Sequence, residues 1–246
     1  KGIVSGATRF STNPKELKIA EMAVEVMENS GYFKDGFSFQ TGTGGASLTV
    51  TRFLRDKMLK KNIKADFALG GITGAIVKLH EEGLIKKLLD VQDFDLEAAR
   101  SVKENPLHCV VSGHHYAGSG SEGSAVNQLD IVVLSALEID KNFNVNVLTG
   151  SDGVIRGDIG CHPDTASGAK MTIVVAPLMR GRIPTILDRV NTIVTPGSTV
   201  DVLVTEYGTA VNPLRQDLIG KLLIAGIKLN TIEELQKTSE KIVGKP

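Results

Sequence analysis

The chain contains no tryptophan, only two cysteines and no excess of charge of either sign. Its 28 Lys and Arg side chains balance 28 Asp and Glu side chains, and Lys and Arg never form a run longer than a pair. Nucleic acids and anionic membranes bind to basic surfaces, so this composition argues against both as partners. The sequence also lacks an apolar run near 18 residues, the length that a membrane-spanning helix needs.

The two cysteines, Cys109 and Cys161, have neither the spacing of metal ligands nor the number that a disulfide framework requires. We expect both to be reduced thiols, and we expect no metal in this chain. No signal-like segment opens the sequence, which predicts a cytoplasmic location. The chain starts at Lys1 without an initiator methionine, so we expect a piece of a longer protein.

The order of apolar and polar segments predicts an α/β fold. Hydrophobic residues make up 41% of the 246 residues, enough for a sizeable core in one large or two small domains. Residues 131–134 and 172–176 are apolar throughout rather than alternating, as in strands that are covered on both faces. We therefore expect an open, mainly parallel sheet with helices on both faces. The β-prone segments are residues 65–69, 107–111, 131–134, 144–148, 172–176, 192–194 and 200–205.

Residues typical of helix N-termini occur near both ends of the chain. Asn13, Pro14 and Glu16 predict a helix over residues 14–29. Asn212 with Pro213, and Thr231 with Glu234, predict two more helices near the end of the chain. An acid-rich helix is expected near residues 93–104. Residues 113–124, GHHYAGSGSEGS, are expected to form the most flexible loop.

The most informative stretch is a glycine turn between an apolar segment and a helix-forming segment, residues 37–60. Glycines let the backbone approach a ligand, and the following helix adds the positive end of its dipole. This order predicts a site for a phosphate or a developing oxyanion, although a plain tight turn between strand and helix is the alternative. The turn is neither a Walker A motif nor a dinucleotide fingerprint. Its candidate residues are Thr41, Gly42, Thr43, Gly44, Gly45 and Ala46.

Four strings in this order resemble the C-terminal half of CoA transferases: QTGTGG from Gln40, LGGITG from Leu69, SALEID from Ser135 and VTEYGTA from Val204. The strings KGIVSGATRF, TGTGGASL and TGSDGVIRGDIGCHPD further resemble the alpha subunits of citrate lyase. The resemblance implies a CoA-transferase-like fold, with residues 1–246 as the C-terminal domain of a two-domain chain. It also implies a site between the two related halves.

The same resemblance implies an activity, in which citrate displaces acetate from an acetylated acyl carrier protein. It implies a citrate CoA-transferase that works beside a lyase (beta) subunit and an acyl carrier (gamma) subunit, with citrate and acetate as substrate and product. The implied cofactor is the carrier's phosphoribosyl-dephospho-CoA, or CoA and acetyl-CoA. The N-terminal half of the same subunit is an implied partner, and we expect a homo-oligomer.

The chain departs from glutamate-using relatives at the position of their nucleophile. The resemblance aligns their L-G-I-H-x-E segment with residues 69–74, which puts Gly74 at the glutamate and leaves Thr73 beside it as a substrate contact. We therefore expect a citrate carboxylate to attack the acetyl thioester directly and form a mixed anhydride, with Gly44, Gly45 and Gly74 as catalytic backbone. Gly74 would leave room for citrate. The alternative is an ordinary turn, with Glu81 or Glu82 as nucleophile.

Citrate's carboxylates require convergent cations, and arginine matches a carboxylate bidentately. Arg156 and His162 lie in a glycine-punctuated loop and are candidates for this role. The alternatives are an ion pair of Arg156 with Asp152 or Asp158, and a structural hydrogen bond for His162. Arg180 follows a predicted buried strand, where substrate binding and a solvated turn are equally plausible.

Glu206 should emerge at the carboxyl end of a strand, where open α/β sheets place ligands. Glu138, in contrast, is expected to be buried and paired. At most one of the adjacent His114 and His115 is expected to function. The competing functions are a non-catalytic scaffold that binds the carrier arm and partner subunits, a CoA transferase for a related acid such as citramalate, and a sugar-phosphate isomerase.

Overall fold

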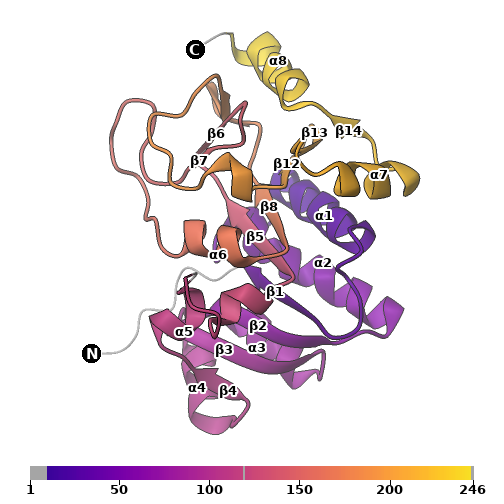
Figure 1. The fold of residues 1–246 in the computed structure, drawn as a ribbon, viewed down its shortest axis with the longest axis vertical. Coiled ribbons are helices and arrows are strands. Elements are labelled where there is room, and N and C mark those ends of the chain that lie inside the picture. The colour runs from indigo at the N-terminus through magenta and orange to yellow at the C-terminus, as the bar shows by residue number, and fades with distance from the viewer. Residues whose placement is uncertain (1–9, 119, 245–246) are drawn as a thin grey trace.

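The computed structural model describes residues 10–118 and 120–244, and its central feature is a nine-stranded sheet (Figure 1). The strand order is β14-β13-β12-β8-β5-β1-β2-β3-β4, and each neighbouring pair is parallel except β12 with β13. The open, mainly parallel sheet predicted from the sequence is confirmed. Its strands are β1 (Phe37–Thr41), β2 (Ala65–Ile72), β3 (Ile85–Asp93), β4 (His108–Val110), β5 (Ile131–Ser135), β8 (Met171–Val175), β12 (Val202–Thr205), β13 (Gly208–Val211) and β14 (Leu229–Asn230).

Helices cover both faces of this sheet, and Figure 1 shows α1 and α2 on one side with α5 and α6 on the other. The first layer holds α1 (Pro14–Asn29), α2 (Gly45–Lys61), α3 (Gly74–Glu81), α4 (Leu96–Glu104) and α7 (Gln216–Ile224). The second layer holds α5 (Gly113–Ala117), the short helix η1 (Ala125–Gln128) and α6 (His162–Gly168).

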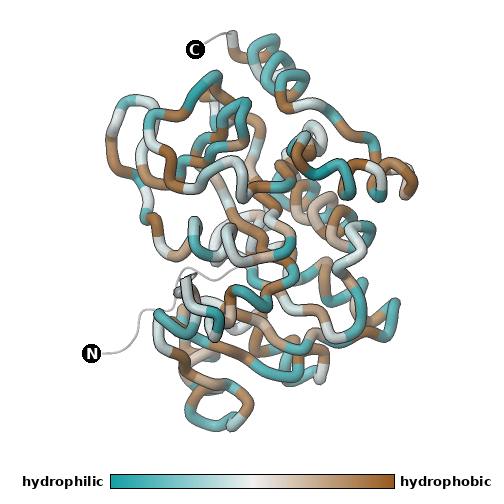
Figure 2. Tube along the Cα trace, viewed as in Figure 1, coloured by the Kyte–Doolittle hydropathy of each residue, from teal (hydrophilic) through white to brown (hydrophobic). Residues whose placement is uncertain are grey.

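The side chains of β5 show why its sequence is apolar without alternation. Ile131 and Val133 pack in the core under α1 and α2, whereas Val132 and Leu134 pack in the core under α5 and α6. Successive residues of a strand point to opposite faces, so a strand covered on both sides needs apolar residues at every position. The hydrophobic colouring of the central strands in Figure 2 follows from this burial.

A smaller unit packs against β8, β12 and β13 and has its own hydrophobic core. It contains the three-stranded sheet β11-β6-β7, the hairpin β9-β10 and the helix α8. These elements are β6 (Glu138–Asp140), β7 (Val145–Asn146), β9 (Met179–Arg180), β10 (Ile183–Pro184), β11 (Ile186–Leu187), the short helix η2 (Gly197–Thr199) and α8 (Ile232–Val243).

Two predicted helix starts are confirmed. The Asn13 side chain accepts a hydrogen bond from Lys15 N at 3.0 Å, and α1 has the predicted bounds. Thr231 and Glu234 form the capping box of α8, with Thr231 Oγ1 3.2 Å from Glu234 N. Both signals are local, because the capping side chain and the amide that it caps lie within a few residues.

Other local predictions were wrong. Asn212 does not start a helix, since its amide group donates to Gly197 O and Val200 O and α7 begins only at Gln216. Residues 192–194 form no strand. Within the expected loop over 113–124, residues 113–117 form the helix α5, and residue 119 lies outside the described residues. The sequence analysis did not predict β3, because the adjacent charged residues Lys86 and Lys87 interrupt its apolar pattern. No helix in the described part of the chain is long and apolar enough to cross a membrane.

Candidate functional site at the carboxyl edge of the sheet

The glycine turn leaves β1 at its carboxyl end and leads directly into α2. Gly42 N donates to Val133 O at 3.0 Å, Gly44 is the N-cap residue, and the 17-residue helix starts at Gly45. The backbone N–H groups of Gly44, Gly45 and Ala46 donate to no acceptor among the described residues. Free amides at the positive end of a helix dipole can bind an anion, so the geometry fits the predicted oxyanion or phosphate site.

The two central glycines of this turn differ in what a side chain would meet. Gly45 has φ of +48°, in the left-handed region that favours glycine, and a Cβ there would lie 3.1 Å from Glu16 Oε1. Gly44 has an ordinary φ of −112°, and a Cβ there would have nothing within 4 Å. The Gly45 conformation is therefore needed for the turn itself, whereas Gly44 faces open space.

Two buried polar atoms at strand ends have no hydrogen-bond partner, and they are the two such side-chain atoms among the described residues. Thr73 Oγ1 lies at the N-cap of α3, just after β2, and makes no capping bond. Glu206 follows β12, and its Oε2 accepts from Leu178 N at 2.7 Å while Oε1 has only Lys15 Nζ at 4.0 Å. Buried polar groups are normally paired, so both atoms indicate a place where a further group binds.

Among the residues that the structure describes, no carboxylate forms an ion pair with Arg180. Its guanidinium donates to Ala136 O at 2.6 Å, Leu137 O at 2.8 Å and Thr185 Oγ1 at 3.2 Å, all of them neutral acceptors. Desolvation by burial lowers its pKa, but an arginine remains protonated at neutral pH. This cation is therefore available to an anionic ligand.

Short contacts connect the glycine turn, Glu206 and the segment that leads into Arg180. A Cβ on Gly45 would lie 3.1 Å from Glu16 Oε1, and the adjacent Lys15 Nζ lies 4.0 Å from Glu206 Oε1. Glu206 Oε2 in turn accepts from Leu178 N, two residues before Arg180. The structure thus brings together the turn, Arg180 and Glu206, which the sequence reading placed in one site. Arg180 also lines a cavity of about 460 Å³, within the size range of small-molecule sites. It is lined in part by Leu137, Ser151, Arg156, Arg180, Arg182 and Ile183.

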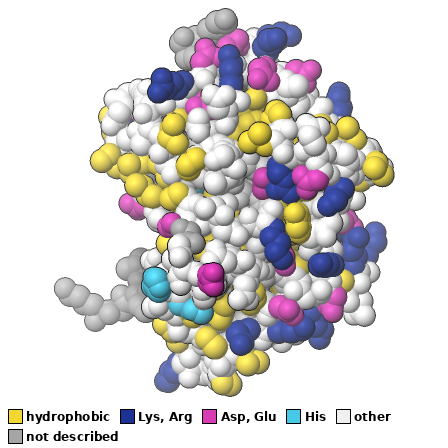
Figure 3. Space-filling view, viewed as in Figure 1, with side chains coloured by type: hydrophobic (Ala, Val, Ile, Leu, Met, Phe, Trp, Pro, Cys, Tyr) yellow, Lys and Arg dark blue, Asp and Glu magenta, His cyan; other side chains and the backbone are white. Residues whose placement is uncertain are grey.

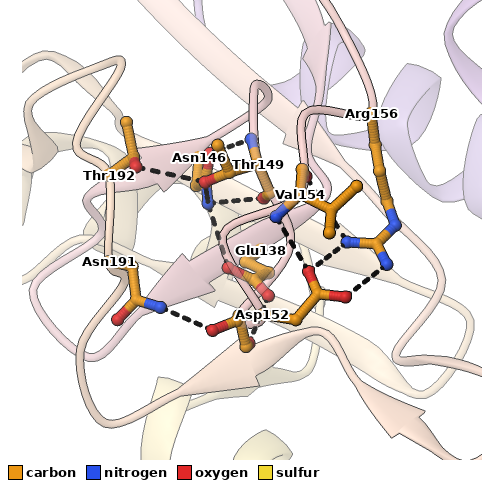
Figure 4. Close-up of polar contacts among 9 residues, drawn as sticks. Glu138, Asn146, Thr149, Asp152, Val154, Arg156, Asn191 and Thr192 are labelled. Carbon is orange, nitrogen blue, oxygen red and sulfur yellow. Dashed lines mark hydrogen bonds and ion pairs between the residues drawn. The ribbon is translucent and has the colours of Figure 1, made fainter.

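Arg156 also lines this cavity, but its charge is already paired (Figure 4). It forms a bidentate ion pair with Asp152, at 2.5 and 2.7 Å, and this pair holds the pKa of Asp152 below its usual value. The geometry fits the ion-pair alternative that the sequence left open. Glu138 is buried and accepts from Ser151 Oγ and Asn146 Nδ2, as expected.

His162 does not lie in a loop, because it is the first residue of α6. Its Nδ1 lies 2.5 Å from Thr195 Oγ1 and its Nε2 lies 2.9 Å from Ser135 O. Burial lowers its pKa, so the neutral ring donates from Nε2 to the carbonyl and accepts at Nδ1 from the hydroxyl. Both nitrogens are used within the protein, which fits a structural role.

Gly74 lies at the start of α3, beside α4, and it also lines a cavity of about 460 Å³ with Leu48 and Lys78. Gly74 N donates to Asp95 Oδ2 at 2.8 Å, and a Cβ on Gly74 would lie 3.0 Å from Glu97 Cβ. The first turn of α4 therefore lies where a side chain on Gly74 would point, and the role of Gly74 in leaving room for citrate stays a prediction. The alternative nucleophiles are occupied too, since Glu81 pairs with Arg100 and Glu82 with Arg55 on the helix surface. His114 and His115 are exposed on α5.

Sequence reasoning missed Glu16 and Lys15 as neighbours of the site. Both belong to the first turn of α1 and approach Gly45 and Glu206 only because α1 packs beside α2 and β12. No local motif signals this proximity.

Known proteins with similar sequence cover the whole chain. The sequence model of the family described as citrate lyase, alpha subunit (CitF) matches residues 1–246. The citrate lyase alpha chains of Klebsiella pneumoniae and Escherichia coli (strain K12) are each 61% identical over 244 residues, which is 99% of this chain and 48% of each relative. The chain spans about half the length of these relatives.

Solved structures agree with the sequence comparison. A structure described as the alpha subunit of citrate lyase from Streptococcus mutans in complex with citrate has a TM-score of 0.95 and 60% identity over 98% of this chain and 48% of that chain. RipA from Yersinia pestis has a TM-score of 0.66 at 16% identity, over 98% of this chain and 56% of its own, and shares the fold. This chain belongs to the citrate lyase alpha subunit family.

Proposed function

We propose that this chain is the C-terminal domain of a citrate CoA-transferase, which transfers an acyl carrier thioester from acetate to citrate. Its family membership supports the reaction class. The observation that carries the site is the juxtaposition of unpaired donors at one edge of the sheet, namely the free amides of the glycine turn and the unneutralised Arg180. Such donors suit a substrate with several carboxylates and a carbonyl oxygen that gains charge.

In this proposal, each group at the edge has a separate role. The amides of Gly44, Gly45 and Ala46 stabilise negative charge on the reacting carbonyl oxygen or bind a phosphate of the cofactor. Arg180 binds a citrate carboxylate, and Glu206 Oε1 accepts a hydrogen bond from the citrate hydroxyl. Thr73 Oγ1 offers a further polar contact.

The reaction needs no redox partner and no side-chain nucleophile. A citrate carboxylate oxygen attacks the acetyl carbonyl carbon, the C–S bond breaks, and sulfur leaves as a thiolate. The resulting mixed anhydride is opened when its citryl carbonyl carbon accepts the sulfur and acetate leaves. The phosphoribosyl-dephospho-CoA of the carrier, or CoA, supplies the thiol when bound. The residues of this chain hold and polarise the reacting groups.

The proposed partners are the acyl carrier (gamma) subunit, the lyase (beta) subunit, further copies of the subunit and its own N-terminal half. Exposed apolar residues beside the cavity suit contact with such a partner. Val154, Ile155, Ile159 and Ile183 are 54%, 72%, 44% and 65% exposed, and Figure 3 shows hydrophobic side chains gathered over the region of β6 and β7. We keep the cytoplasm as the proposed location.

A non-catalytic role is the second candidate. The engaged hydrogen bonds of His162 and the ion pair of Arg156 favour a scaffold that binds the carrier arm while the other half performs the reaction. Citramalate is the alternative acid for the catalytic role, because it also carries a hydroxyl beside a carboxylate. An exchange assay on the full-length subunit, with citrate, citramalate and acetate compared, separates these candidates.

Gly44→Val in the full-length subunit should lower the exchange rate by about two to three orders of magnitude, because a side chain would block approach to the amides of the turn. The thermal unfolding midpoint should not change, since a Cβ on Gly44 has open space around it. Gly220→Val is the matched control on α7, where a Cβ also meets nothing within 4 Å. If Gly44→Val were as active as the control, the glycine turn would have only a structural role.

Arg180→Lys should raise the KM for citrate about tenfold or more, because a charge-assisted contact is lost, with a much smaller change in the KM for the acyl donor. Arg156→Lys is the control from the same cavity, and its KM values should stay close to wild type because Asp152 already neutralises this arginine. Equal increases for both substrates in Arg180→Lys would instead indicate a structural arginine.

The full-length subunit should require both substrates together and give intersecting rather than parallel initial-rate lines, because Gly74 supplies no nucleophile for a covalent intermediate. Preincubation with the acyl donor alone should leave the subunit resistant to borohydride. Recovery of a CoA thioester on Glu81, Glu82 or another glutamate would overturn direct attack by citrate.

A further inference from the structure

A cluster of metal-ligating side chains lies away from the glycine turn, at the ends of β3 and β4. Asp90 and Asp93 close β3, and His108 opens β4. One ligand atom from each residue lies within 4.8 Å of the other two, and His108 Nε2 is 3.2 Å from Asp90 Oδ2. The two strands run in parallel with Leu88 opposite His108, which brings the imidazole beside the carboxylates.

Neighbouring groups hold two of these side chains in a single orientation. His108 Nδ1 lies 2.9 Å from Ser101 Oγ of α4, so the opposite nitrogen, Nε2, faces the carboxylates. Asp90 Oδ1 accepts from Gln92 N at 2.8 Å and from Ile72 N at 3.3 Å, which leaves Oδ2 directed at the histidine. Metal-binding histidines are usually held through their other ring nitrogen in this way.

The charges of the cluster favour a cation. Asp90 is 1% and His108 is 4% exposed, and no Lys or Arg in the described ranges forms an ion pair with Asp90 or Asp93. Two carboxylates and an imidazole nitrogen that face one another without a Lys or Arg partner are a donor set that a bound positive ion stabilises.

We propose that Asp90, Asp93 and His108 bind a divalent transition-metal ion of the Zn²⁺ or Mn²⁺ class. One imidazole nitrogen and two carboxylate oxygens are ligands that both ions accept. With metal–ligand bonds of about 2.1 Å, adjacent tetrahedral ligands lie about 3.4 Å apart, close to the observed His108–Asp90 separation. Asp93 is exposed, which provides an entry path and leaves a coordination position for water.

The bound ion stabilises the backbone at the carboxyl end of β2, next to the candidate site. Asp90 opposes Gly70 in the sheet, where a register shift occurs between Gly70 and Gly71, and its carboxylate also holds Ile72 N. Thr73, with its unpartnered hydroxyl, follows immediately. The proposal differs from the sequence expectation of no metal, which considered cysteine spacing and could not see ligands joined by strand pairing. It does not depend on the proposed acyl exchange.

The test is a titration of the chelator-treated full-length subunit with Zn²⁺ and with Mn²⁺, followed by calorimetry and thermal unfolding. Wild type should bind one ion at this site and unfold at a higher temperature when the ion is present. Asp93→Asn should keep the metal-free unfolding temperature, because Asp93 is exposed, but should weaken binding by about tenfold or more. Co²⁺ should give a visible absorption band in wild type that Asp93→Asn loses.

Cys109→Ser is the matched control, because Cys109 follows His108 in β4 and its side chain points to the opposite face. It should bind as wild type does. The proposal is overturned if neither ion shows saturable binding, if Asp93→Asn binds with wild-type affinity, or if Cys109→Ser abolishes binding and so identifies a thiol site.

Discussion

At the centre of the sheet, β1 pairs in parallel with β2 on one side and with β5 on the other, and helices bury both faces of these strands. Parallel strands end at a common edge, so the carboxyl ends of β1, β5, β8 and β12 deliver their next residues to one place. The glycine turn follows β1, Glu206 follows β12 and Arg180 lies shortly after β8, although these residues are far apart in the sequence. Ligand sites in open α/β sheets form at this edge for the same reason.

Arg156 and Arg180 show how tertiary contacts decide which charge is available to a ligand. Both arginines line one cavity, but the charge of Arg156 is neutralised by a bidentate ion pair with Asp152, four residues earlier in the chain. Arg180 instead reaches across to the carbonyls of Ala136 and Leu137, which orient it without neutralising it. A guanidinium held by neutral acceptors keeps its charge and its position, which favours binding of an anion.

Two features of the segment after β2 bear on the role of Gly74. Gly74 lacks the side chain that glutamate-using relatives employ, yet its Cβ direction is filled by the first turn of α4. A carboxylate placed there would meet Asp95 and Glu97 rather than a substrate. Helix packing thus accounts for the absence of a side chain at Gly74, whereas the groups with free donors lie at Arg180 and the glycine turn.

Local signals in the sequence determined the α/β class, the start of α1 at Pro14, the capping box at Thr231 and the strand-turn-helix at Gly44, because each depends on residues that are close in the chain. The family strings also identified the relatives. Only the tertiary structure decided that Glu16 approaches Gly45, that Asn212 binds carbonyls instead of capping a helix, and that His162 is used structurally. These contacts join residues from separate elements, and strand pairing and helix packing determine such distances, whereas spacing along the chain does not.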